Sequence, residues 1–178
     1  AYYRGDGTTD LSDFRLFTSG TERVRFSETG NVGIGTSTFN GTNPEKLLVD
    51  AGTTGSFNVI SGRGNINNYL QLNIQNRSSG TSASSDVVAT ANNGSETANY
   101  INMGVNSSGY SNTALPILDG VNTTYLYATG RNFFIGNGSS GRDLVFFTNG
   151  FASTDEKIRI LSNGNVGIGV TNPSDKLT

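Results

Sequence analysis

The chain has 178 residues, twelve basic and fourteen acidic, so its formal net charge is −2. This balance excludes a basic surface for nucleic acid, and the lack of an apolar run of roughly 18 residues excludes membrane insertion. Hydrophobic residues make up only 34%, and His and Cys are absent, which leaves a thin core and excludes a Ser-His-Asp triad and ordinary zinc sites.

Several segments alternate apolar residues with polar residues or glycines, the period-two pattern of half-buried strands. In chain order these segments are Val24–Phe26, Val32–Ile34, Leu70–Ile74 and Ile101–Val105. The continuous apolar run Leu144–Phe147 predicts a strand that is covered on both faces. No long helix is indicated, so we expect an all-β fold with short strands and turns rich in Gly and Asn.

Two other segments are read as turns and loops. Asn43–Leu48 has two interpretations: one helical turn that begins at Pro44, or a turn that leads into a strand Leu47–Val49, which we favour. The stretch Ser78–Ser85 consists almost entirely of Ser, Thr, Gly and Ala and predicts a surface loop.

The main feature of the sequence is an internal repeat. Residues 13–20 read DFRLFTSG, and residues 143–150 read DLVFFTNG. The hexapeptide Gly-Asn-Val-Gly-Ile-Gly then occurs twice, and an Asn-Pro and a Lys-Leu follow each copy. Its residues are Gly30, Asn31, Val32, Gly33, Ile34 and Gly35, and then Gly164, Asn165, Val166, Gly167, Ile168 and Gly169. The period is too long for a solenoid and indicates modules in series.

This repeat divides the chain into three parts. Residues 1–52 form a stalk element with the first hexapeptide, and residues 131–178 form a second stalk element that repeats 13–48. Residues 53–130 form a middle module, which is the candidate binding region because it carries most of the tyrosines among Asn, Ser and Gly.

The hexapeptide places Val32 and Ile34 on one strand face and Gly33 and Gly35 on the other. The apolar face is too small to form a core alone, so we expect it to meet copies of itself. Three chains around an axis would pool these side chains, while the glycines would let neighbouring strands approach closely. The alternative is a plain hairpin with a glycine bulge.

At this point the sequence resembles the stalks of bacteriophage tail fibres. The resemblance rests on Gly30–Thr36, Asn43-Pro44 and Lys46-Leu47, and on the matching second copy. In that family the motif often precedes an endosialidase-type chaperone domain, which this chain does not contain, so self-cleavage is not assigned. Five extra residues, 38–42, also depart from the pattern.

The resemblance implies an elongated, interwoven β-structure of β-prism or β-helix type, a homotrimer, and a virion or extracellular location. The implied role is to hold or present surfaces that bind a host receptor. Similar motifs occur in bacterial surface proteins, so a cellular filament or adhesin module is a second interpretation.

Amphipathic rings beside amides suit contacts with a cell-surface glycan or a protein receptor. The candidate ligand-binding residues are Tyr69, Tyr100, Tyr110, Tyr125 and Tyr127. Tyrosine on an outer strand face is also ordinary packing.

With His and Cys absent, carboxylates are the remaining candidates for catalysis or metal binding. A polysaccharide depolymerase would need two acids that face each other across a sugar, and the middle module offers Asp86, Glu96 and Asp119 without fixing a pair. Asp6, Asp10 and Asp13 lack the spacing of an EF-hand and read as an acidic turn. We therefore expect no enzyme, no cofactor and no metal.

The sequence also contains six glycosylation sequons, a number expected from its high content of Asn, Ser and Thr. They lie at Asn40, Asn76, Asn93, Asn106, Asn122 and Asn137.

Overall fold

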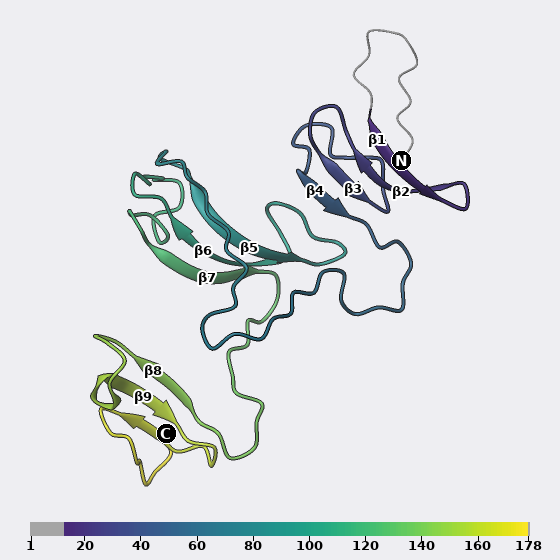
Figure 1. Cartoon of the computed structure of the whole chain (residues 1–178). Helices are drawn as coiled ribbons and strands as arrows, with labels where there is room; N and C mark the ends of the chain where they lie inside the picture. Colours follow the sequence, from purple (N-terminus) through teal and green to yellow (C-terminus); the bar gives the residue numbers. More distant parts are fainter. Residues whose placement is uncertain (1–12, 178) are drawn as a thin grey trace. The chain divides into compact units, whose positions relative to one another are not determined.

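The computed structural model of the chain describes residues 13–177 (Figure 1). The chain divides into two compact units, 1–71 and 72–178, and each is described by itself. The described residues form three small β-sheets and one 3-10 turn, Ser153–Asp155, so the expected all-β class is confirmed. None of the sheets closes on itself. The described part of the chain holds no helix that is long and apolar enough to cross a membrane.

The first unit contains a four-stranded N-terminal sheet. Its strands are β1 (Phe14–Thr18), β2 (Thr21–Phe26), β3 (Val32–Ile34) and β4 (Leu47–Val49), in that order across the sheet. The first three are antiparallel, and β4 runs parallel to β3. Ser19 and Gly20 both have positive φ, 50° and 75°, the conformation that a tight hairpin turn requires. The expected strand Leu47–Val49 is confirmed.

The second unit contains a middle sheet of β5 (Ser84–Thr90), β6 (Tyr100–Asn106) and β7 (Thr124–Thr129). The three strands are antiparallel, with β6 in the centre. The expected strand Ile101–Val105 is confirmed as the core of β6. The predicted loop Ser78–Ser85 ends two residues too late, because Ser84 and Ser85 already pair with β6.

The same unit contains a C-terminal sheet of β8 (Leu144–Phe147), β9 (Glu156–Ile160) and β10 (Val166–Ile168), with β9 in the centre. Its register repeats that of β1 to β3: Val145 pairs with Arg159 and Arg159 with Gly167, as Arg15 pairs with Arg25 and Arg25 with Gly33. The sequence repeat is therefore also a repeat of strand pairing.

Two strand predictions are corrected. Leu144–Phe147 is a strand, but it is not covered on both faces, since Phe146 and Phe147 are 44% and 53% exposed and no described layer packs on them. Leu70–Ile74 alternates like a strand but is irregular, and Leu72 is 90% exposed. Alternation marks an amphipathic segment, whereas a strand also needs a neighbour for its backbone hydrogen bonds.

Each sheet has one face made of apolar side chains. In the N-terminal sheet the register aligns two rows across the four strands. These rows are Leu16, Val24, Ile34, Val49 and Phe14, Phe26, Val32, Leu47. In the C-terminal sheet the corresponding rows are Leu144, Ile160, Val166 and Phe146, Ile158, Ile168. In the middle sheet the face consists of Val87, Ala89, Ile101, Met103, Val105, Leu126 and Ala128.

These apolar faces are open to solvent rather than packed into a core. On the middle sheet Met103 is 56% and Leu126 is 51% exposed, and on the N-terminal sheet Leu47 is 57% exposed. Among the described residues, Tyr110 is the one large apolar or aromatic side chain that is buried. The thin core expected from composition is therefore found, and the sheets have apolar area left to cover.

Candidate functional site

The hexapeptide glycines are required by the chain's own turn. A β-carbon at Gly33 would collide with the carbonyl oxygen of Thr36 and lie 3.2 Å from the ring of Phe39. A β-carbon at Gly167 would collide with the carbonyl oxygen of Val170 and lie 3.3 Å from Pro173 Cγ. The expected close backbone approach is present, but the approaching backbone belongs to the same chain and follows directly in sequence.

The alternative of a glycine bulge at this position is wrong. Gly33 pairs regularly with Arg25 on one side and Leu48 on the other, without a register shift. The irregularity in this sheet lies between Leu16 and Phe17 instead. As predicted, Val32 and Ile34 share a face that Gly33 does not.

The asparagine of the hexapeptide holds the segment that follows it. Asn31 is 3% exposed, and its Oδ1 accepts a hydrogen bond from Lys46 Nζ at 2.8 Å. In the second copy, Asn165 Nδ2 donates to the carbonyl oxygen of Pro173 at 3.1 Å. The asparagine thus holds the Lys-Leu in the first copy and the Asn-Pro in the second.

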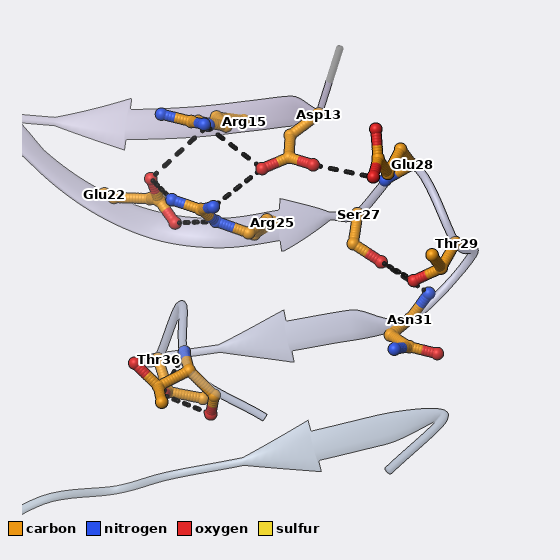
Figure 2. Close-up of polar contacts among 10 residues, drawn as sticks. Asp13, Arg15, Glu22, Arg25, Ser27, Glu28, Thr29, Asn31 and Thr36 are labelled. Atoms are coloured by element: carbon orange, nitrogen blue, oxygen red, sulfur yellow. Dashed lines mark hydrogen bonds and ion pairs between the residues drawn. The ribbon is translucent and has the colours of Figure 1, made fainter. Parts of the chain in front are cut away.

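Arg25 lies between two carboxylates on the face opposite the apolar one (Figure 2). Its Nη1 is 2.6 Å from Asp13 Oδ2, and its Nε is 2.8 Å from Glu22 Oε1. Asp13 Oδ1 also accepts the backbone N–H of Glu28 at 3.1 Å. This network joins the start of β1, the centre of β2 and the turn before β3.

The C-terminal sheet repeats this network. Arg159 Nη1 is 2.7 Å from Asp143 Oδ2, its Nε donates to Glu156 Oε1 at 2.8 Å, and Asp143 Oδ1 accepts the backbone N–H of Ser162. Sequence reasoning missed this network. The available signal was that Asp, Glu and Arg keep their identity in both copies of the repeat.

Both arginines lower the pKa of neighbouring carboxyls. Hydrogen bonds from Arg25 lower the pKa of the Glu22 carboxyl, and hydrogen bonds from Arg159 lower the pKa values of Asp143 and Glu156. Each network ties residues of one sheet together, so we interpret both as structural clasps of the repeated element.

Three of the five predicted tyrosines gather on the polar face of the middle sheet. The hydroxyls of Tyr100 and Tyr127 are 3.2 Å apart, and the ring centroids of Tyr125 and Tyr127 are 5.7 Å apart. Tyr125 donates to Asp86 Oδ1 at 2.7 Å across the intervening strand, where a β-carbon at Gly104 would collide with both side chains. Burial and this hydrogen bond raise the pKa of Tyr125 to about 12.

The other two tyrosines do not join this cluster. Tyr110 is 8% exposed in the turn after β6, and its hydroxyl lies 3.4 Å from Asn112 Nδ2. Tyr69 is 83% exposed in an irregular segment of the first unit. The tyrosine cluster is held together by its own contacts, and its role in binding a ligand stays a prediction.

Two of the carboxylates considered as catalytic acids form hydrogen bonds with different partners and do not pair with each other. Asp86 accepts hydrogen bonds from Tyr125 and Ser84, while Asp119 Oδ1 accepts the backbone N–H groups of Asn112 and Gly120. Asp6 and Asp10 lie outside the described residues. Within residues 13–177 no three acids gather into a group that would hold a metal ion.

Comparison of the chain with protein-family models and with curated proteins finds no match.

Proposed function

We propose that this chain is a non-catalytic structural segment of an extracellular or virion fibre of the phage tail-fibre type. Copies of the chain associate through the apolar faces of their sheets, and the middle module presents the surface that meets the host. The number of copies, three, comes from the resemblance of the hexapeptide region to tail-fibre stalks.

The observation that carries the proposal is that each of the three sheets leaves much of one apolar face exposed. Soluble monomers rarely expose contiguous apolar patches of more than a few hundred Å², and larger patches mark interaction sites. A single exposed leucine would mean little, whereas aligned rows such as Val87, Met103 and Leu126 form a continuous surface. The neighbouring row on the same face, Ala89, Ile101 and Ala128, is also apolar.

The exposure of single side chains supports the same interpretation. On the middle sheet Val87 and Leu126 are each 51% exposed, and on the N-terminal sheet Phe26 is 43% exposed. Covering apolar faces with copies of the same chain would supply the core that the sheets lack.

The absence of catalysis is part of the proposal. Asp86 and Asp119 are both used in holding strands and turns together, and Glu96 lies in the loop between β5 and β6. The polysaccharide depolymerase alternative therefore gains no support from an arranged acid pair.

Native mass spectrometry of the whole chain tests the proposal, with two valines of β5 as a matched pair. Val87 and Val88 are both 51% exposed, but Val87 lies on the apolar face and Val88 on the tyrosine face. We expect the wild type and Val88→Glu to give three times the chain mass, and Val87→Glu to dissociate.

The proposal fails if the wild type is a folded, soluble monomer at micromolar concentration. It also fails if Val87→Glu and Val88→Glu behave alike, because a general effect of a new charge would then explain any dissociation. Circular dichroism of each variant records whether β-structure is lost together with the assembly.

A further inference from the structure

The middle module contains a polar groove that no sequence feature indicated. Its volume is about 400 Å³, within the range of roughly 300–1,000 Å³ that small ligands occupy. The walls come from residues 75–79, the start of β5, the end of β6 and Asn122. Because these segments lie far apart in the sequence, only the folded module brings them together.

The groove is pre-formed by hydrogen bonds between its walls. Asn76 donates from its backbone to Ser85 Oγ at 2.8 Å and from its side chain to the Ser84 carbonyl at 3.0 Å. On the other side, Ser107 Oγ donates to the Gly80 carbonyl at 2.8 Å, and Ser107 N donates to the Ala83 carbonyl at 2.9 Å. A ligand therefore meets walls that are already in place, which lowers the entropy cost of binding.

One buried side chain in the groove keeps an acceptor unused. Asn106 is 4% exposed, and its Nδ2 donates to the carbonyls of Leu118 and Gly120 at 2.7 and 3.1 Å. Its Oδ1 accepts no hydrogen bond from the described residues and retains some exposed surface, so it can accept one from outside the chain. A hydroxyl donor on a ligand would satisfy it.

The lining chemistry defines the ligand. It consists of serines, amides and one arginine, with Val105 as the one strongly apolar residue, and it includes no acid. Arg77 forms no ion pair with any described residue. Serines and amides match sugar hydroxyls, and a guanidinium matches a carboxylate or phosphate in a two-point contact.

We propose that this groove binds an anionic saccharide, with the acidic group on Arg77 and hydroxyls on Asn106 and the groove serines. The proposal rests on the proposed function, since it names the ligand class of the surface that the fibre presents. It places that contact at the end of the middle sheet rather than on the tyrosine cluster.

Titration calorimetry on the whole, assembled chain tests the proposal with three probes. Trigalacturonate carries the carboxylate, its fully methyl-esterified form carries neutral methyl esters in the same positions, and glucose 6-phosphate carries a phosphate instead. We expect one or both acidic probes to bind, and the ester to bind more weakly by on the order of tenfold or more, since a charged hydrogen bond is lost. Which acidic probe binds more tightly identifies the anionic group.

The matched variants are Arg77→Gln and Arg131→Gln. Both remove one exposed positive charge from the second unit, but Arg131 does not line the groove. We expect Arg77→Gln to lower the affinity for the acidic probe on the order of tenfold, and Arg131→Gln to change it less than about twofold.

Equal binding of the acid and its ester would overturn the proposal, as would equal losses in the two variants or no binding at millimolar probe. Native mass spectrometry of the same samples separates this failure from failure of the proposed function. A trimer that binds none of the probes refutes the proposal for the groove and leaves the proposed function intact.

Discussion

Replacing Gly33 with alanine adds a single methyl group where the structure leaves no room for it. The new β-carbon would stand against the carbonyl oxygen of Thr36, a backbone atom that moves only if the whole turn moves. It would also lie 3.2 Å from the Phe39 ring, which has to shift by a few tenths of an ångström.

The expected cost follows from two opposing terms. Overpacking a tight site destabilises by about 1–3 kcal/mol, whereas replacing a glycine within a strand gains roughly 0.5–1 kcal/mol. At the midpoints of the two ranges the collision outweighs the gain, and we expect Gly33→Ala to lower the free energy of unfolding by about 1 kcal/mol per chain. In an assembly of identical chains the loss is multiplied by the number of copies.

Urea unfolding of the variant measures this loss, with Gly41→Ala as the control. A β-carbon at Gly41 would meet nothing within 4 Å, so that change is expected to be neutral or to stabilise by about 0.4–1 kcal/mol. Gly167→Ala should behave like Gly33→Ala, because its β-carbon meets Val170 in the same way. A Gly33→Ala protein that is as stable as the wild type, or more stable, would refute the reasoning.

Two further predictions concern titration. Glu22 beside Arg25, and Asp143 and Glu156 beside Arg159, have lowered pKa values in the folded state, so their contribution is full above their ordinary values of 4.5 and 3.8 and is lost as pH falls below them. Urea unfolding between about pH 7 and pH 3 should show this fall in stability, and Arg159→Gln should flatten it while Arg131→Gln leaves it unchanged. An equal slope in both variants would contradict the assignment. Ultraviolet titration should show Tyr125 ionising at about pH 12, well after ordinary tyrosines, and the hydrogen bond with Tyr127 raises the pKa of Tyr100 as well. Tyr125→Phe should remove that late step, and its persistence would show that another tyrosine is responsible.

Local patterns predicted much of the architecture. Alternation located β2, β3 and the core of β6, and the repeated hexapeptide predicted that β3 and β10 would be equivalent strands. These predictions succeeded because the two faces of a strand alternate residue by residue, a property that a short window of sequence contains. The same alternation at Leu70–Ile74 failed because pairing depends on a neighbour that no local window shows.

The candidate sites were less accessible to sequence reasoning. The tyrosine cluster depends on Tyr125 reaching Asp86 across β6, and only the register of three strands brings those residues together. The groove likewise combines Asn76, Asn106 and Asn122, whose spacing along the chain carries no common pattern.

The sequence by itself determined the strand-forming segments, the repeated element and the division of each strand into an apolar and a polar face. Only the tertiary structure decided that the backbone crowding Gly33 belongs to its own turn, that Arg25 is clasped by Asp13 and Glu22, and that a polar groove exists. The physical reason is the distance along the chain between the residues that interact. Face alternation arises from the geometry of neighbouring residues, whereas collisions, ion pairs and grooves depend on which distant segments the hydrogen-bonded register places side by side.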